Sequence, residues 1–218
     1  MGFVVHTIPG SPFGRAVLAT LEEKGAAYRI VAVPPDGLRS PEHLGRHPFG
    51  RIPMLEHDGF LLYETQAILR HLDRVLPEPP LTPANPQAAA RMDQVMNVND
   101  WYLFHGCSSV IVFNRMVAPR LLGLPTDEAA CAAAVAPGRA VFAELARLLG
   151  DQPYLAGSAP SLADLLVAPQ LDLLAATPEW PELGPPHPTL VAWLARVTAR
   201  SSMQATTVER ILEKTAAN

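Results

Sequence analysis

One serine lies where a protein can stabilise an anion. The segment Pro9–Arg15 (PGSPFGR) lies between a short apolar stretch and an amphipathic one, which predicts a turn from a strand into a helix. Ser11 would be the N-cap of that helix and Pro12 its first residue. A helix N-terminus carries partial positive charge and unpaired N–H groups, so the Ser11 hydroxyl could donate there to a thiolate. A purely structural cap predicts the same pattern.

A second candidate lies in the loop HPFGRIPMLE, residues 47–56. Its Ile52-Pro53 dipeptide comes just before a predicted strand, where a proline belongs at the first position or at an edge. If the Ile52-Pro53 bond is cis, the N–H and C=O of Ile52 face outward and can pair with an extended peptide. A simple turn proline is the alternative.

A third candidate, Glu64-Thr65, follows a predicted strand and precedes a predicted helix. The Thr65 hydroxyl and nearby N–H groups could bind a carboxylate, while Glu64 could pair with an ammonium group. A capping threonine before a solvated helix is the alternative. The three candidates are expected at the same edge of one small sheet. Together they offer an anion pocket, a backbone ladder and a clamp for a zwitterion, which is the chemistry that a short peptide needs.

The first half of the chain has the pattern of a small α/β domain. Its order predicts a right-handed parallel β-α-β unit, a connecting loop, and then an antiparallel hairpin followed by a helix. Asp58-Gly59 is the expected hairpin turn, and Gly25 ends the first helix. The predicted strands are 3–6, 28–33, 54–57 and 60–63, and the predicted helices are 12–24 and 65–75.

A proline-rich stretch separates this half from the rest, since five of the ten residues from Pro77 to Pro86 are proline. We therefore predict domains over 1–77 and 87–218, joined by a linker over 78–86. The second domain shows no convincing strand and is expected to be all-helical, which gives an α/β plus all-α fold. Its predicted helices are 87–117, broken at Pro119; 127–149, with a kink or interruption at Pro137-Gly138; one opened by the capping box Ser161–Asp164; 188–199; and one more in the tail after Ser201.

Composition excludes several function classes. The 218 residues are 49% hydrophobic and 17% charged, with a net charge of −4, so nothing global indicates nucleic acid or an anionic membrane surface. No secretory signal or long apolar span is evident, and the chain is expected to be cytoplasmic. Cys107 and Cys131 are too few for a disulfide framework, and no Cys/His cluster has the spacing of a metal site.

Four motifs in order resemble the cytosolic glutathione transferases, and the serine-type phi, theta and related bacterial members most. The resemblance covers essentially the whole chain. It implies a thioredoxin-like N-terminal domain and a helical C-terminal domain, with glutathione as co-substrate and no further cofactor. The motifs are Ser11-Pro12-Phe13-x-Arg15, His47-Pro48-Phe49-Gly50-Arg51-Ile52-Pro53, Glu64-Thr65-x-Ala67-Ile68 and Ser161-Leu162-Ala163-Asp164.

The resemblance also implies individual roles. The Ser11 hydroxyl would stabilise the glutathione thiolate, and Phe13 would line the same site and face the electrophile. Ile52, before a cis Pro53, would pair through its backbone with the cysteinyl residue. Glu64 and Thr65 would hold the γ-glutamyl end. Two motif residues are predicted to be structural: Arg15 and Asp164.

Two arginines extend this assignment. Arg39 lies where family members commonly place a basic residue near the glycyl carboxylate. Arg51 departs from the commoner glutamine or lysine, and either binds a glutathione carboxylate or faces solvent.

The electrophile pocket is expected between the domains. Phe104, His105 and Ser108 are predicted to share one face of the first long helix and to join Phe13 there, with core packing the alternative for Phe104. Family members are usually homodimers, and Phe49 either enters the neighbouring subunit or stays in its own core.

The resemblance leaves the activity open. Conjugation of small electrophiles is the leading hypothesis, and isomerase, dehalogenase or peroxidase chemistry would use the same thiolate site. A thiol reductase is disfavoured because residue 11 is serine. A non-catalytic binding module is the alternative of a different class.

Overall fold

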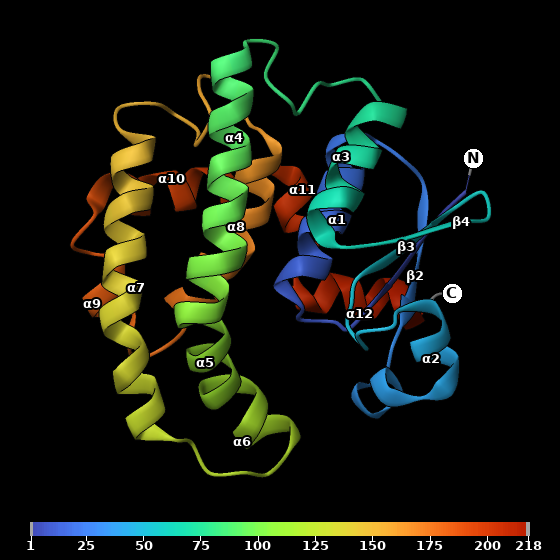
Figure 1. Cartoon of the computed structure of the whole chain (residues 1–218), viewed down its shortest axis with the longest axis horizontal. Coiled ribbons are helices and arrows are strands. Elements are labelled where there is room, and N and C mark those ends of the chain that lie inside the picture. Colours follow the sequence, from blue (N-terminus) through green and yellow to red (C-terminus); the bar gives the residue numbers. More distant parts are fainter. Residues whose placement is uncertain (1, 217–218) are drawn as a thin grey trace. The chain divides into compact units, whose positions relative to one another are not determined.

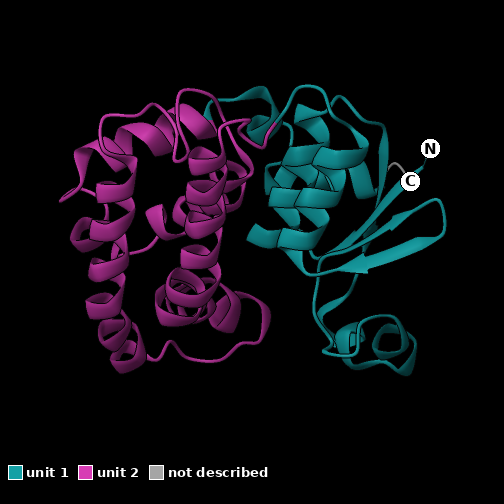
Figure 2. Ribbon diagram, turned by 45° about the horizontal axis from the view of Figure 1, so that its top comes forward, with its two compact units in different colours: residues 1–80, 199–218 teal, residues 81–198 magenta. Residues whose placement is uncertain are grey.

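The computed structural model describes residues 2–216, which form two compact units (Figure 1). One unit comprises the chain up to Pro80 together with the chain from Ala199 onward, and the other comprises Leu81–Thr198 (Figure 2). The sequence analysis included residues 199–218 in the helical domain 87–218, whereas the structure groups them with the first unit.

The first unit is built on a four-stranded sheet of order β2-β1-β3-β4. The outer pairings are as the sequence predicts, since β1 pairs with β2 in parallel and β3 with β4 in an antiparallel hairpin. The hairpin turns at Asp58 and Gly59, which both have positive φ, 48° and 86°. The strands are β1 (Phe3–Thr7), β2 (Tyr28–Ala32), β3 (Met54–His57) and β4 (Phe60–Tyr63).

Two helices, α1 (Pro12–Glu23) and α3 (Thr65–Val75), contact each other and supply much of the apolar core. Leu18 and Leu21 of α1 and Ile68 and Leu69 of α3 are fully buried. This confirms the thioredoxin-like half of the predicted fold. At about 25 cal/mol per Å², burial of such side chains is the main force that holds the helices against the sheet.

The predicted connecting loop between β2 and β3 contains two short helices. A 3₁₀-helix covers Pro35–Arg39, and α2 covers Pro41–Arg46. Ser40 caps α2 by accepting a hydrogen bond from the N–H of His43 at 3.2 Å, and Pro41 takes the first helical position. Elements of five and six residues are too short to show apolar periodicity, so periodicity did not predict them.

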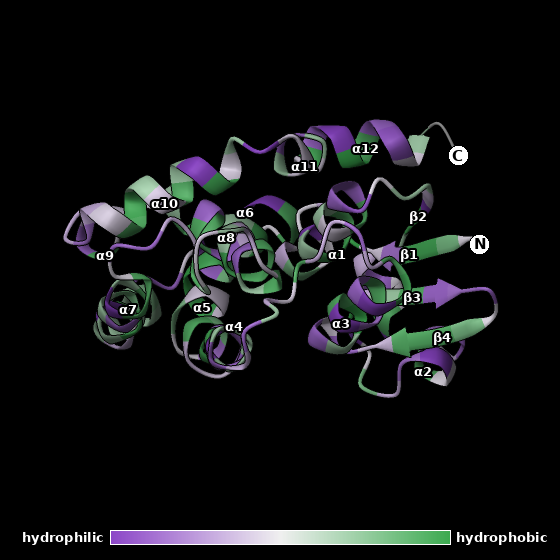
Figure 3. Ribbon diagram, turned by 90° about the horizontal axis from the view of Figure 1, so that it is seen from above, coloured by the Kyte–Doolittle hydropathy of each residue, from purple (hydrophilic) through white to green (hydrophobic). Residues whose placement is uncertain are grey.

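The C-terminal tail packs within the first unit through α11 (Ser201–Gln204) and α12 (Val208–Ala216). Arg200 donates to both carboxylate oxygens of Glu23, at 2.7 and 2.8 Å. Lys214 of α12 donates to Glu22 at 2.5 Å. Figure 3 shows alternating hydrophobic and hydrophilic bands along α12, and Ile211 is buried. An amphipathic helix and two ion pairs to the α1 end therefore hold the tail on this unit.

The second unit is helical, as predicted. One helical path runs from α4 through two π-helical segments, Asn99–Ser108 and Phe113–Val117, to α6. Pro119 does not break this path, which continues through α6 to Leu121. The α-helices are α4 (Pro86–Val98), α5 (Ser109–Val112), α6 (Ala118–Leu121), α7 (Glu128–Leu149), α8 (Leu162–Ala175), α9 (Trp180–Leu183) and α10 (Pro188–Thr198).

Helix α7 runs unbroken through Pro137, so the predicted interruption is absent there. By length and composition α7 could cross a membrane. Core helices of globular proteins pass the same test, and α7 buries Phe142, Leu145 and Leu149 in the helical unit.

A buried carboxylate organises the helical unit at the start of α8. The predicted capping box of Ser161 and Asp164 is present. Asp164 is fully buried and accepts four hydrogen bonds: from Leu155 N at 2.9 Å, Ser161 N at 2.8 Å, Ser161 Oγ at 2.7 Å and Trp193 Nε1 at 2.7 Å. The structural role that the sequence assigns to Asp164 follows from these contacts.

We expect Asp164→Asn to lower the free energy of unfolding by about 3 kcal/mol, because an amide has one acceptor oxygen and its NH₂ would face hydrogen-bond donors. Urea denaturation of the purified chain measures the change. Asp151→Asn, at an exposed position, is the matched control and should shift stability by less than about 0.5 kcal/mol. Equal effects of the two substitutions would contradict a special role for Asp164.

Candidate active site

The sheet register brings the predicted segments to one end of the sheet. His6 of β1 lies opposite Met54 of β3, and Met54 lies opposite Tyr63 of β4. The chain therefore leaves β1, enters β3 and leaves β4 at the same end. The segments next to these three strand ends are those that the sequence singled out: Ser11, Ile52-Pro53 and Glu64-Thr65.

Ser11 is the N-cap of α1, as predicted. Its Oγ accepts a hydrogen bond from the N–H of Gly14 at 3.1 Å, which uses a lone pair and leaves the hydroxyl hydrogen to donate. Gly14 is needed for this arrangement, because a Cβ there would lie 1.9 Å from Thr7 Oγ1 at the end of β1. Ser11 is half-buried, at the partially positive end of the helix.

The Ile52-Pro53 peptide bond is cis. Pro53 is buried and Ile52 is half-buried. The carbonyl oxygen of the preceding residue, Arg51, lies 2.9 Å from Nε2 of the buried His43. Since a carbonyl can only accept, Nε2 carries the hydrogen and donates it. A side chain from α2 therefore holds the backbone immediately before Ile52.

Glu64 has an unusual backbone, with φ 69° and ψ 112°. A non-glycine residue at such a positive φ is strained, and strain of this kind concentrates at functional sites. Glu64 occupies the N-cap position of α3 without a capping side-chain bond, and Thr65 is the first helical residue. Thr65 is therefore not a simple capping threonine. The Glu64 side chain is exposed, while Thr65 is buried.

Arg39 lies against the loop that leads to Ile52. Gly50 has φ 59°, and a Cβ there would lie 2.8 Å from Leu38 O and 3.3 Å from Arg39 Nη1. Arg39 and Arg51 are both exposed. This end of the sheet thus carries two guanidinium groups and the Glu64 carboxylate, which suits a ligand with carboxylates and an ammonium group.

The predicted electrophile residues fall in both units. Phe13 is half-buried on α1, whereas Phe104 and His105 lie half-buried and exposed on the π-helical segment of the helical unit. Ser108 is 1% exposed and donates to Gln170 Oε1 of α8 at 2.8 Å. Ser108 is therefore better explained as a packing residue, and we leave it out of the proposed pocket.

Phe49 is 61% exposed, so it does not stay in the core of its own unit. Its ring forms T-shaped pairs with the rings of His47 and Tyr63, at centroid distances of 6.1 and 6.3 Å.

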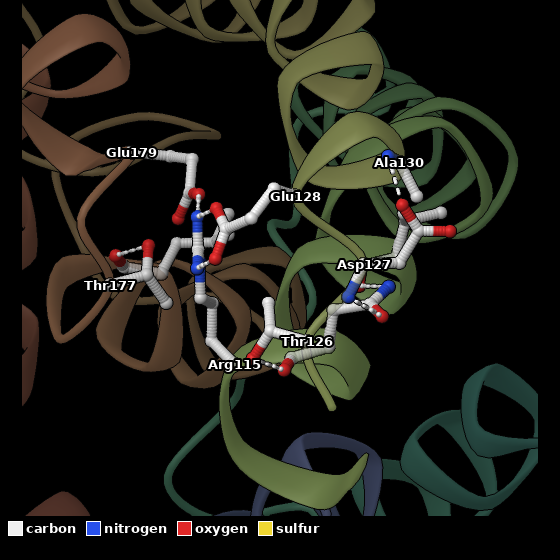
Figure 4. Close-up of polar contacts among 10 residues, drawn as sticks. Arg115, Thr126, Asp127, Glu128, Ala130, Thr177 and Glu179 are labelled. Atoms are coloured by element: carbon white, nitrogen blue, oxygen red, sulfur yellow. Dashed lines mark hydrogen bonds and ion pairs between the residues drawn. The ribbon is translucent and has the colours of Figure 1, made fainter. Parts of the chain in front are cut away.

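Asn114 and Arg115 join separate parts of the helical unit, a role that sequence reasoning missed. Figure 4 shows Arg115 beside Glu128 and Glu179. Arg115 donates to both carboxylate oxygens of Glu128 at 2.7 Å, and through Nε and Nη2 to Glu179 Oε1 at 2.9 and 2.6 Å. Asn114 Oδ1 accepts from the N–H of Asp127, the N-cap of α7, at 3.2 Å. Glu128 and Glu179 lie 13 and 64 positions from Arg115, so no local sequence pattern predicts these contacts.

Since Glu179 is buried, Arg115→Leu leaves its charge unpaired, and we expect the free energy of unfolding to fall by about 3 kcal/mol. The double variant R115L/E179L should recover much of the loss, because no unpaired buried charge remains. Urea denaturation of both variants measures this. A double variant as unstable as R115L would show that the pairing of Glu179 is not the cause.

An ionic cluster anchors α2 to the sheet. Arg46 of α2 pairs with Glu56 of β3, and Nε2 of His6 in β1 lies 2.9 Å from Glu56 Oε1 and 3.1 Å from Arg46 Nη2. Burial, and secondarily the positive charge of Arg46, lowers the pKa of His6 to about 4. His6 is therefore neutral at pH 7.

This shift predicts acid destabilisation. Because the pKa of His6 is about 4 in the folded chain and 6.5 ordinarily, the unfolded chain binds more protons between these values. Stability should fall as the pH drops through that window, by up to about 3 kcal/mol from this group. His6→Gln, which cannot titrate, should flatten the dependence of the urea midpoint on pH from 6.5 to 4. An unchanged slope would contradict the assignment.

The comparisons with known proteins agree with this geometry. The family model described as "Glutathione S-transferase, N-terminal domain" matches residues 5–80, and that described as "Glutathione S-transferase, C-terminal domain" matches residues 128–196. A probable glutathione S-transferase of Oryza sativa subsp. japonica, GSTF1, is 31% identical over 193 residues, which is 86% of this chain and 87% of the relative.

Two solved structures extend the match to the fold. Glutathione transferase F7 from Populus trichocarpa has a TM-score of 0.85 at 27% identity, covering 98% of this chain and 99% of its own. Glutathione S-transferase-I bound with lactoylglutathione has a TM-score of 0.81 at 27% identity, covering 99% of both chains. The family matches, the relatives and the fold together show that this chain belongs to the glutathione transferase family and is a glutathione transferase.

Proposed function

We propose that the chain activates glutathione through the Ser11 hydroxyl and conjugates it to small hydrophobic electrophiles. The observation that carries this proposal is the Ser11 geometry. Its Oγ accepts from Gly14 N–H, so the hydroxyl hydrogen can point to an anion at the positive end of α1. The shared sheet end supports the proposal, because the other peptide-binding groups lie beside it.

Each part of the tripeptide has a candidate partner. The backbone of Ile52 pairs with the cysteinyl residue, and Glu64 and Thr65 hold the γ-glutamyl end. Arg39 binds the glycyl carboxylate, with Arg51 as a second cation at that end. The similar glutathione S-transferase-I was solved with lactoylglutathione, a glutathione conjugate, which supports binding of the tripeptide here.

The energy required is modest. A free thiol has a pKa of about 8.5 and is only a few per cent thiolate at neutral pH. Lowering that pKa by about two units needs about 2.7 kcal/mol of preferential stabilisation of the thiolate. One charge-assisted hydrogen bond plus a helix N-terminus is of this order.

The thiolate then attacks the electrophilic carbon. A C–S bond forms, and either the leaving group departs with its bonding pair or, in an addition, the adjacent carbon takes a proton from water. Ser11 remains a hydrogen-bond donor throughout and forms no covalent bond. Phe13 is the proposed contact of the electrophile in the first unit, and the exposed Phe49 is the proposed homodimer contact.

We expect Ser11→Ala to lower kcat roughly 10- to 100-fold and to leave the glutathione Kd within a few-fold, since the lost bond acts on the thiolate. Initial rates with a chlorinated nitrobenzene measure kcat, and titration calorimetry with glutathione measures Kd. The pKa of the bound thiol, followed by thiolate absorbance, should rise toward its free value.

Asn85→Ala is the matched control, because Asn85 caps α4 by accepting from Gln87 N and Ala88 N and takes no proposed part in the chemistry. Unchanged turnover in S11A would overturn the role of Ser11. No glutathione binding by the unmodified chain at millimolar ligand would favour a non-catalytic module. Higher rates with an organic peroxide or a maleyl substrate would assign the same thiolate to peroxidase or isomerase chemistry.

A further inference from the structure

We propose that His43 in α2 and His47, the C-cap residue of that helix, are positioning residues that set the direction of the glutathione-binding groups. His43 orients the amide of Ile52, and His47 supports the segment that carries Glu64. This inference rests on the proposed function of the sheet end as the glutathione site.

The two rings form a buried stack. His43 lies in α2, and His47 is the C-cap residue directly after it, with an extended backbone. Their ring planes are within 9° of parallel, with centroids 6.2 Å apart. The exposed fractions are 7% for His43 and 2% for His47. Neither side chain therefore presents a broad surface to a ligand, and any effect on binding must pass through what the rings hold.

His43 acts on the Arg51–Ile52 peptide group. Its Nε2–H donates to the Arg51 carbonyl oxygen at 2.9 Å. That peptide bond is trans, and in a planar trans peptide the C=O and the following N–H point in opposite directions. Holding the Arg51 oxygen toward α2 therefore directs the Ile52 N–H away from α2. This is the N–H that the proposed function pairs with the cysteinyl residue.

His47 acts on the end of β4. Its ring stacks on Tyr63 at a centroid distance of 4.6 Å and an angle of 30°. Tyr63 immediately precedes Glu64, whose strained φ of 69° persists only while its neighbours are held firmly. The stack thus runs from the Arg51 carbonyl through two imidazoles to the residue beside Glu64, and it links two glutathione-binding segments.

His47 works as an uncharged ring. Its Nδ1 is buried and has no hydrogen-bond partner among residues 2–216. Burial lowers the pKa of His47; the Glu64 charge opposes this shift, and His43 and Arg51 add to it. Phenylalanine should therefore serve in place of His47, whereas His43 needs the Nε2–H that donates to the Arg51 oxygen.

The positioning role is separable from folding, because α2 has another anchor. Arg46 pairs with Glu56 on β3, independently of either histidine. Loss of the His43 hydrogen bond should therefore leave α2 on the sheet and free only the orientation of the Arg51–Ile52 amide.

The first test compares His43→Phe, which keeps a ring but has no donor, with His43→Gln, whose amide Nε2–H can still reach the Arg51 oxygen. We expect H43F to raise KM for glutathione about tenfold, the loss of one hydrogen bond, with kcat at saturating glutathione within a few-fold. H43Q should restore KM to within a few-fold of the unmodified chain. Equal KM values for H43F and H43Q would overturn the proposal for His43.

The second test does not depend on whether H43F folds. His47→Phe should keep KM for glutathione near its original value, and His47→Ala should raise it several-fold, since only alanine loses the stack on Tyr63. Equal KM values for H47F and H47A would overturn the role of His47. Calorimetry of the unmodified chain with glutathione distinguishes failure of the proposed function from failure of the positioning role. Absence of glutathione binding refutes the proposed function. Glutathione binding together with an unchanged KM in H43F refutes the positioning role alone.

Discussion

Met54 pairs with His6 on one side and with Tyr63 on the other, and the rest of the candidate site depends on this register. A slip of one residue in β3 would turn every side chain of that strand to the opposite face of the sheet. It would also move Pro53 relative to the ends of β1 and β4. The apolar burial of Leu55 opposes such a slip, so the same contacts that form the core also align the binding groups.

The two units are held by different kinds of interaction. The first combines an apolar core with ion pairs to its C-terminal tail, such as that of Arg200 with Glu23. The helical unit adds buried polar centres, above all Asp164 with four donors and Glu179 with Arg115. Groups of this kind cost desolvation and stabilise only when fully paired. Asp164 lies in the first turn of α8 and Glu179 is the N-cap residue of α9, so these groups mark where the two helices begin.

Local signals predicted much of the first unit. The Asp58-Gly59 hairpin and α3 have the predicted bounds, and Ser11 is the N-cap that its neighbours indicate. Tertiary contacts decided the rest: α2 is too short to show a period, and the tail joins the first unit through Glu22 and Glu23, far away in sequence. Ser108 was expected in the electrophile pocket, but it is buried against Gln170 of α8, a contact between residues 62 positions apart that no local pattern shows.

A ligand held through backbone groups raises a particular problem for a protein. The N–H of Ile52 belongs to every possible residue at that position, so no substitution of Ile52 removes it, apart from proline. Its direction depends in part on the group that holds the adjoining carbonyl, here His43. The hydrogen bond from His43 to Arg51 is therefore where selection could tune the affinity for glutathione without touching Ser11. The proposed site would separate the orientation of the Ile52 amide, which depends on His43 of α2, from activation of the thiol by Ser11 at the N-terminus of α1.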